Sequence, residues 1–509
     1  MLASLRTAAV YGIEACPVHV EVDVSFGLPS FVMVGLPDTT VRESRERVRL
    51  AIRNSGFEYP PHRITVNLSP ADLRKAGTSF DLPIALGILA ASGVVERRHI
   101  ADMVLLGELS LDGSVHATRG VLPIAVAARR DGMAGLLMPV ANANEAAIVA
   151  GLQVLAVSSL ADAVQALNGG PCPTLPAPPA PSNPLSTPPA PPGPPAVFDL
   201  ADVRGQRLAR RALEVAAAGG HNLLLVGPPG AGKTMMARRL PGILPPLGIE
   251  EALDVTAVHS VAGVLPPGSG LIRERPFRAP HHTISNAALV GGGSIPRPGE
   301  VSLAHHGVLF LDEMLEFSRH VLEVLRQPLE EGRVTIARAA RTTAFPARFM
   351  LVGAMNPCPC GFAGDPQREC RCTPPQVAHY RGKLSGPLRD RLDLTVEVAA
   401  LPIEAMSDGG GEPSAAIRAR VVAARERQAQ RLTGDALLTN AELTPALMMT
   451  HCALTAAALR VLRAAAVRMT LSARGYDRVR KVARTIADLE GEDEITADAI
   501  GEALQYRMV

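Results

Sequence analysis

The chain has 509 residues, a length that predicts more than one domain. Its formal net charge of +2 is too small for a nucleic-acid footprint over the whole surface, so any basic contact surface must be local. Tryptophan is absent and aromatic residues make up 3% of the chain, which argues against recognition of bases by stacking.

The apolar runs of the chain are short. The longest one, Leu82 to Val95, is interrupted by Pro83 and two glycines, so no membrane span is expected. Near the N-terminus, Glu14 and a short apolar stretch do not fit a signal peptide. These features predict a cytoplasmic protein.

Residues 1–167 predict an α+β domain. Val18 to Val24 alternates apolar and polar side chains, which indicates a half-buried strand, and Ile64 to Leu68 indicates a second strand. Between them, Asp38 is placed to cap a helix in which Glu43 and Arg47 are spaced to form an ion pair. Strands and helices are therefore mixed in this part of the chain.

Two segments of this domain resemble the proteolytic domain of the Lon family, which has a ribosomal-S5-like α+β fold. Gly77-Thr78-Ser79 matches the place of the nucleophile, and residues 107–130 match the segment that supplies the catalytic lysine. No lysine occurs between Val94 and Leu200, and Leu122 stands at the aligned position. A serine needs a base to become a nucleophile, so we interpret Ser79 as structural and ATP-dependent proteolysis as the least favoured function.

Residues 168–197 predict a linker between two halves of the chain. Within them, residues 171–197 contain 13 prolines and little apolar material, which is typical of an extended, semi-rigid segment. We expect an ATPase core over residues 198–400 and a helical lid over residues 401–509.

A glycine-rich turn follows the apolar strand Asn222 to Val226 and precedes a helix-compatible run. Its backbone N–H groups can surround a triphosphate, with the lysine reaching the β- and γ-phosphates and the threonine hydroxyl on Mg²⁺. A helix that begins there adds its dipole. The predicted ATP-binding residues are Gly227, Pro228, Pro229, Gly230, Ala231, Gly232, Lys233 and Thr234.

A second apolar strand, Val308 to Leu311, ends in two acidic residues, Asp312 and Glu313. The first carboxylate is expected to hold Mg²⁺ through its water shell, together with Thr234. The second is expected to orient the water that attacks the γ-phosphate. The two motifs together predict an ATP hydrolase that uses Mg²⁺.

Later motifs resemble those of AAA+ ATPases, which have an α/β P-loop core and a C-terminal helical lid. The strand that ends at Asn356 resembles sensor 1, whose side chain touches the γ-phosphate or the attacking water. Residues 388–394 resemble the segment with the arginine finger, for which Arg391 is the first choice and Arg389 the alternative. Arg478 lies in a segment that resembles sensor 2 and is expected to reach the bound nucleotide.

Two further segments resemble insertions of one AAA+ clade. Residues 273–293 resemble the helix-2 insert. Residues 333–345 alternate and contain no acidic residue, which predicts a β-hairpin that resembles the pre-sensor-1 hairpin. In the clade of Mg-chelatase motor subunits and MCM helicases these elements line a central channel. Arg338 and Arg341 are therefore candidate contacts to DNA phosphates, with solvated hairpin charges as the alternative.

Four of the seven cysteines form two C-x-C pairs within residues 358–372. Cys358, Cys360, Cys370 and Cys372 can close a tetrahedral, structural Zn²⁺ site. A disulfide is the alternative, but it is disfavoured in a cytosolic protein. His379 and the pairs His281/His282 and His305/His306 are possible substitute ligands that a complete thiolate set makes unnecessary.

Residues 414–484 carry thirteen basic and four acidic side chains. This local excess is compatible with contact to a polyanion or with a solvated helical lid.

From Tyr11 onward the chain resembles the ComM/YifB group of Mg-chelatase-like AAA+ proteins. The marks are the Lon-like domain, Asn356-Pro357-Cys358-Pro359-Cys360-Gly361, and Ser472-Ala473-Arg474-Gly475-Tyr476. The resemblance implies a homo-hexameric ATPase that drives branch migration of DNA during natural transformation. The alternative is a chelatase-type motor that remodels a protein partner.

Overall fold

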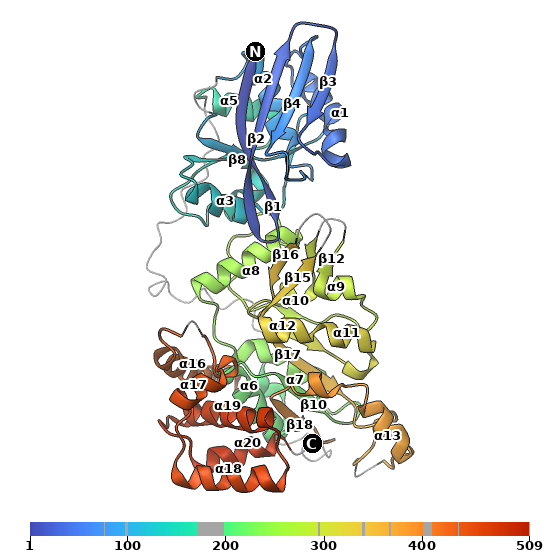
Figure 1. The fold of residues 1–509 in the computed structure, drawn as a ribbon, viewed down its shortest axis with the longest axis vertical. Coiled ribbons are helices and arrows are strands. Elements are labelled where there is room, and N and C mark those ends of the chain that lie inside the picture. The colour runs from blue at the N-terminus through green and yellow to red at the C-terminus, as the bar shows by residue number, and fades with distance from the viewer. Residues whose placement is uncertain are drawn as a thin grey trace.

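The structure is a computed structural model that describes residues 1–75, 77–96, 100–170, 198–293, 296–337, 342–365, 368–400, 410–435 and 437–507. The predicted proline-rich linker lies almost entirely outside these residues. Figure 1 shows the N-terminal domain at one end of an elongated molecule, the ATPase core in the middle and the C-terminal helices at the other end.

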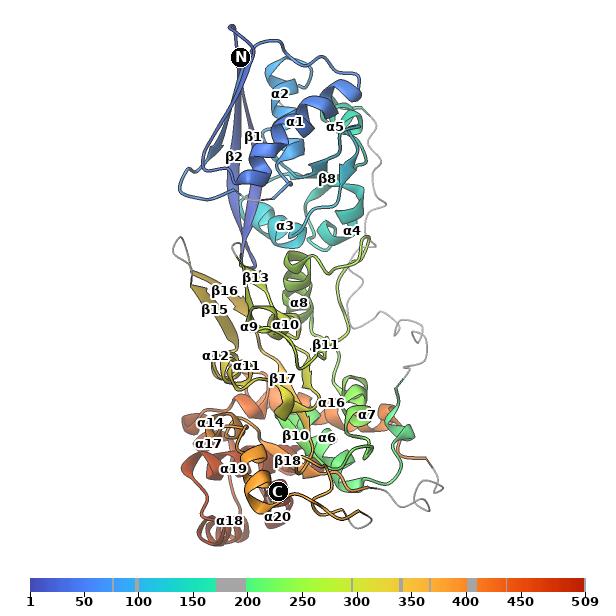
Figure 2. The same ribbon diagram turned by 90° about the vertical axis from the view of Figure 1, so that its right-hand side faces the viewer.

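The N-terminal domain is built on a seven-stranded mixed sheet with helices on one face (Figure 2). The order of its strands is β3-β4-β2-β1-β5-β8-β9. Their bounds are β1 Leu2–Tyr11, β2 Glu14–Ser25, β3 Ser30–Val34, β4 Arg63–Ser69, β5 Met103–Leu105, β8 Gly135–Pro139 and β9 Gln153–Val157. A separate short hairpin joins β6 Glu108–Leu109 to β7 Val115–His116.

The helices of this domain are α1 Thr39–Asn54, α2 Asp81–Ala91, α3 Val121–Arg130, α4 Ala143–Ala146 and α5 Leu160–Leu167. Asp38 caps α1 as predicted, since its carboxylate accepts the Val41 N–H at 2.8 Å. The predicted Glu43–Arg47 pairing is wrong: Arg47 instead forms two hydrogen bonds to the buried carboxylate of Asp81. A buried charge needs a partner more than an exposed one does.

The ATPase core contains a five-stranded, all-parallel sheet in the order β11-β14-β17-β10-β18. Its strands are β10 Leu223–Val226, β11 Phe277–Arg278, β14 Val308–Leu311, β17 Met350–Met355 and β18 Leu394–Glu397. The four longer strands are buried along their whole length except at single polar positions in β18, as expected for a sheet covered on both faces.

The core helices are α6 Arg207–Gly219, α7 Lys233–Arg239, α8 Ile249–Ala262, α9 Asn286–Val290, α10 Glu300–Leu303, α11 Arg319–Val324, α12 Arg326–Glu331, α13 Pro374–Arg381 and α14 Gly386–Arg389. Two hairpins project from the core: β12 Gly291–Gly292 with β13 Arg297–Pro298, and β15 Arg333–Ala337 with β16 Thr342–Pro346. The second confirms the hairpin predicted before Asn356. Arg338 and Arg341 lie between its strands, outside the described residues.

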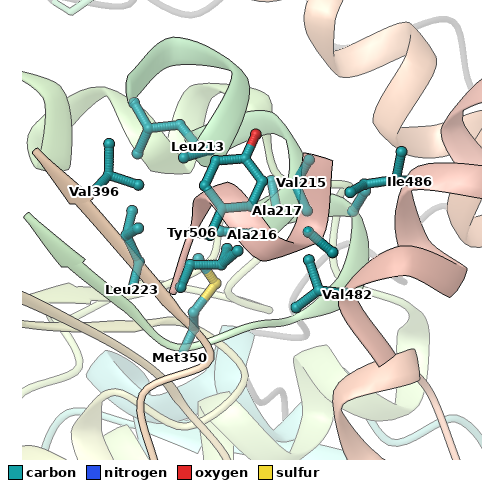
Figure 3. Close-up of a cluster of buried hydrophobic side chains, with 14 of the residues drawn as sticks. Leu213, Val215, Ala216, Ala217, Leu223, Met350, Val396, Val482, Ile486 and Tyr506 are labelled. Atoms are coloured by element: carbon teal, nitrogen blue, oxygen red, sulfur yellow. The ribbon is translucent and has the colours of Figure 1, made fainter. Parts of the chain in front are cut away.

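The C-terminal region is helical, as predicted, with α16 Ser414–Arg431, α17 Pro445–His451, α18 Ala456–Arg468, α19 Ala473–Glu490 and α20 Ala497–Gln505. It shares one hydrophobic core with the ATPase sheet. Figure 3 shows Tyr506 with Leu213 of α6 and Val396 of β18 on one side and Val482 and Ile486 of α19 on the other. No helix among the described residues is both long and apolar enough to cross a lipid bilayer.

The N-terminal domain packs on helix α8 and on the β15–β16 hairpin of the ATPase core (Figure 1). Leu253 and Ala257 of α8 pack against the apolar cluster that includes the buried residues of α3. Beside them, the Ser260 hydroxyl hydrogen-bonds to the buried carboxylate of Glu145. The turn between β1 and β2 reaches strand β16, where a side chain on Gly12 would meet the Ala344 carbonyl oxygen at 2.9 Å. The N-terminal domain therefore contacts both α8 and the β15–β16 hairpin.

Candidate nucleotide site

The predicted phosphate loop joins the carboxyl end of β10 to the first turn of α7. Gly230 and Gly232 have φ values of 81° and 93°, a left-handed conformation that glycine adopts without steric cost. Lys233 is the first residue of α7, so the loop ends at the positive end of a helix dipole. The loop thus has the backbone shape that presents N–H groups to an anion.

Lys233 is only 9% exposed, and its ammonium group points into this loop. It donates to the carbonyl oxygens of Gly227 at 2.6 Å and Pro228 at 2.9 Å, and to Asn356 Oδ1 at 3.2 Å. Burial lowers the pKa of Lys233, and the carboxylates of Asp312 and Glu313 oppose that shift. The group is a buried cation held beside the predicted sensor.

The acidic pair after β14 faces the same loop. Asp312 Oδ2 accepts the Thr234 hydroxyl at 2.7 Å, so both predicted Mg²⁺ ligands are adjacent. Glu313 has a φ of 48°, a conformation that is rare for a residue with a side chain and is found at functional sites. The structure therefore brings Lys233, Thr234, Asp312, Glu313 and Asn356 together at one edge of the sheet.

The two predicted arginines lie at the opposite edge. Arg391 precedes β18, which runs parallel to β10, so it is placed where the strands begin and the phosphate loop where they end. Arg478 donates to Asp390 Oδ1 at 3.1 Å and to the Leu392 carbonyl oxygen at 3.0 Å, which holds it at the same edge. Within this chain Arg478 therefore lies at the edge opposite the phosphate loop, and its contact with a bound nucleotide stays a prediction.

An open cavity of about 610 Å³ lies between this edge and the lid, and both arginines line it. Arg391 also pairs with Glu330, and burial, together with the surrounding arginines, lowers the pKa of Arg391. Arg389 does not line the cavity. Sequence reasoning missed the other cations of the lining, which come from four separate segments: Arg275, Arg348, Arg425, Arg474 and Lys481.

The four predicted cysteines form one cluster. Cys358 Sγ lies 3.3 Å from Cys360 Sγ and 3.6 Å from Cys370 Sγ, and the Cys360 N–H donates to Cys372 Sγ at 3.4 Å. The four Sγ atoms all lie within 4.8 Å of one another. Backbone N–H groups of Phe362 and Arg371 lower the pKa of the Cys360 thiol to about 6. The donor set and its spacing fit a tetrahedral zinc site.

None of the candidate histidines joins the cysteine cluster among the described residues. His305 and His306 instead lie near Asp254, with candidate ligand atoms within 4.8 Å of one another. His305 Nδ1 accepts the Arg348 N–H at 3.0 Å, and burial lowers the pKa of His305 to about 3. Because Nδ1 accepts a hydrogen bond, neutral His305 carries its proton on Nε2, which favours a structural histidine over a metal ligand.

Many of the basic side chains of the lid form ion pairs and hydrogen bonds within the fold. Arg431 and Arg484 pair with the buried carboxylate of Asp488, and Arg480 donates to backbone carbonyl oxygens. Lys481 donates to the Ala441 carbonyl oxygen at 2.9 Å. These basic residues therefore mainly connect the helices of the lid to one another and do not form a continuous basic surface patch.

In the N-terminal domain, Leu122 is buried at the start of α3, and its N–H donates to Glu145 Oε1 at 2.8 Å. Lys75, the only lysine before the linker, donates to the Pro70 carbonyl oxygen. No hydrogen bond joins Ser79 to a base among the described residues. The geometry gives no support to a serine nucleophile.

Three family models match the chain. Residues 199–406 match "Magnesium chelatase, subunit ChlI", residues 20–142 match "Subunit ChlI of Mg-chelatase" and residues 411–507 match "Magnesium chelatase, subunit ChlI C-terminal". These matches agree with an ATPase core followed by a separate helical region.

The chain is 45% identical to "Competence protein ComM" of Haemophilus influenzae over 510 residues, which is 99% of this chain and 97% of that protein. It is 43% identical to "Uncharacterized protein YifB" of Escherichia coli over 511 residues, covering 100% and 97%. The "Magnesium-chelatase 38 kDa subunit" of Rhodobacter capsulatus is 26% identical over 220 residues, covering 40% and 56%. On the basis of these family models and full-length relatives, the chain belongs to the ComM/YifB family of Mg-chelatase-like AAA+ ATPases.

Proposed function

We propose that the protein is a cytoplasmic, ATP-driven motor that acts on single-stranded or branched DNA as a homo-hexameric ring. Its task would be branch migration during the integration of donor DNA in natural transformation. The proposal is supported by the full-length likeness to a protein named for competence. The fold supplies the ATPase part of this activity.

The proposal of a ring rests on one observation: the predicted nucleotide-binding residues lie at two opposite edges of one sheet. The phosphate loop lies at the carboxyl edge, whereas Arg391 and Arg478 lie at the amino edge. A head-to-tail contact between copies would bring the cationic cavity of one subunit to the phosphate loop of the next, and such contacts form a ring when the rotation between copies closes. Arg391 would then act in trans as the arginine finger, with Arg478 beside it.

At the carboxyl edge, each side chain has a distinct role. Lys233 would neutralise charge on the β- and γ-phosphates, and Thr234 with Asp312 would hold Mg²⁺. Mg²⁺ held there would supply positive charge that offsets the negative charge of the phosphates. Glu313 would orient the attacking water, with Asn356 placed to contact the γ-phosphate. The hydrogen bond between Thr234 and Asp312 is consistent with a shared metal site.

We further propose a structural Zn²⁺ bound by Cys358, Cys360, Cys370 and Cys372. Four thiolates leave no open coordination position, so the ion would stabilise the loop and take no part in hydrolysis. In the structure the sulfur atoms converge within one loop, and a disulfide would use only two of them.

DNA contact is proposed for Arg338 and Arg341, which connect β15 to β16 outside the described residues. A hairpin that directly precedes the sensor strand β17 can respond to the nucleotide state, and arginines can bind phosphates without reading bases. Such contacts release counterions, so DNA binding should weaken steeply with salt and depend little on sequence.

The test is ATP turnover with and without forked DNA at low salt. DNA should stimulate turnover, and the double variant Arg338→Ala/Arg341→Ala should lose the stimulation while basal turnover stays close to that of the parent. Arg333→Ala is the matched control, because Arg333 is an exposed arginine at the base of the same hairpin. Unchanged turnover with DNA, together with normal binding of forked DNA by the double variant, would refute the DNA motor.

The second candidate is a chelatase-type motor that remodels a protein partner. It is favoured by the family models, but the likeness to the chelatase subunit covers 40% of this chain. This function predicts no response of ATP turnover to DNA. Proteolysis would require cleavage that depends on Ser79, which has no hydrogen-bonded base among the residues that the structure describes.

A further inference from the structure

The loop that carries the cysteines lies directly against the phosphate loop. An added Cβ atom at Gly361 would lie 2.6 Å from Pro229 Cδ and 2.9 Å from Pro229 Cγ. Carbon atoms do not approach that closely, so the absence of a side chain at Gly361 is what lets the two loops touch. The contact is between a residue of the cysteine loop and the rigid ring of a phosphate-loop proline.

The cysteine cluster determines where Gly361 lies. Gly361 follows Cys360 and has a φ of 88°, in a turn closed by its N–H on the Cys358 carbonyl oxygen at 3.0 Å. The Ala363 N–H donates to Cys358 Sγ at 3.3 Å on the other side of the turn. The turn at Gly361 is thus held on both sides by bonds to Cys358.

The same loop begins at the predicted sensor. Asn356 precedes Cys358 by two residues and hydrogen-bonds to Lys233 at 3.2 Å. Arg381 of α13 donates to the Pro357 carbonyl oxygen at 3.1 Å, which fixes the intervening residue. The cysteine loop therefore touches the phosphate loop at two places, through Asn356 at Lys233 and through Gly361 at Pro229.

We propose that the cysteine loop positions the phosphate loop through the contact of Gly361 with Pro229, so that an intact Cys₄ site is required for tight ATP binding. This inference rests on the proposed ATPase and zinc functions. Gly361 is a positioning residue: it touches no substrate and acts through Pro229.

The first test compares Gly361→Ala with Gly364→Ala. Gly364 also has a positive φ of 81°, but an added Cβ there would meet only Glu397 Oε1, at 3.9 Å. Both variants carry the same backbone strain, and only Gly361→Ala pushes on the phosphate loop. Affinity for a non-hydrolysable ATP analogue should fall on the order of tenfold in Gly361→Ala. Gly364→Ala should bind within about twofold of the parent. Equal affinities would overturn the proposal.

A double-mutant cycle separates the contact from general damage to the loop. Pro229→Ala removes the Cγ and Cδ atoms that the new methyl group would strike, so Gly361→Ala should cost much less affinity in a Pro229→Ala background. If Gly361→Ala lowers the affinity equally in both backgrounds, the contact with Pro229 does not cause the loss, and the proposal is contradicted. If Gly361→Ala alone fails to fold, rescue of folding by Pro229→Ala supports it, and failure of the double variant to fold counts against it.

The third measurement concerns metal. Removal of zinc from the intact protein by a chelator should weaken binding of the analogue, and added Zn²⁺ should restore it, with zinc content followed by elemental analysis. Analogue binding that is unaffected by metal loss contradicts the required role of the Cys₄ site. An intact protein that binds no ATP would instead refute the proposed function itself, so the two failures are distinguishable.

Discussion

Arg391→Ala tests whether the catalytic site is shared between subunits. The four residues of β18 separate Arg391 from the carboxyl edge of the sheet. At about 3.3 Å per residue this is about 13 Å, before the further turn to the phosphate loop is added. Arg391 therefore cannot serve the ATP of its own chain in this conformation. If it serves a neighbour, loss of the finger should lower kcat on the order of a thousandfold.

The decisive assay mixes Arg391→Ala with Lys233→Ala protein, each inactive alone. In a randomly mixed ring, about one interface in four joins an intact phosphate loop to an intact arginine, so about a quarter of parental turnover should return. If Arg391 acted within its own chain, no subunit would contain a complete site and nothing would return. Absence of recovery, with subunit exchange shown by differently labelled chains, refutes the trans assignment. Arg389→Ala, mixed in the same way, tests the alternative finger.

Three further predictions follow from the site. Lys233→Ala should abolish ATP binding, whereas Glu313→Gln should bind ATP without hydrolysing it; normal turnover by either contradicts its role. Protein prepared without chelator should contain about one zinc per chain, and Cys370→Ser should lower that zinc content. Parent protein that contains no metal although its cysteine loop is folded would contradict the proposed zinc site. The folded state lowers the pKa of His305 to about 3, so its stabilising effect is present above the unfolded pKa of about 6.5 and is lost as pH falls. His305 alone should account for about 2 kcal/mol of the stability lost between pH 7 and pH 5, measured by urea unfolding of the parent and a His305 variant. His305→Asn keeps an acceptor for the Arg348 N–H and should flatten that dependence; an equal pH slope contradicts the assignment.

The carboxyl edge of the site could be predicted from sequence because each motif is local. A glycine-rich turn needs residues that adopt positive φ, and an acidic pair directly after an apolar strand must lie at the end of that strand. In a parallel sheet those ends share one edge, so Lys233, Asp312 and Asn356 meet without further information. The cysteine cluster follows from the same logic, since all four thiolates lie within one loop.

The placement of Arg478 could not be predicted, because it depends on how the lid packs. Its helix was expected, and Ser472 caps that helix by accepting the Gly475 N–H at 3.1 Å. Which edge of the sheet α19 covers is decided by the shared core that includes Val482 and Tyr506. Arg47 gives a second example: spacing predicts a pair with Glu43, but the buried carboxylate of Asp81 comes from another helix and is preferred. The strand β1 was also missed, since its buried small residues do not alternate cleanly with polar ones.

The contacts of the N-terminal domain give the proposed motor a mechanical constraint. Gly12 touches β16, and Ser260 of α8 bonds to Glu145, so the domain is attached to the ATPase core at α8 and at the β15–β16 hairpin, the second of which resembles a channel-lining insertion. The β15–β16 hairpin leads directly into β17, and β17 ends at Asn356. If Asn356 moves with the γ-phosphate state as proposed, β17 connects it directly to the hairpin, whose strand β16 lies against Gly12. In a ring, the N-terminal domain would restrain or follow the hairpin that carries Arg338 and Arg341. The N-terminal domain can thus matter for function through where it is attached, even though the described residues show no base paired with Ser79.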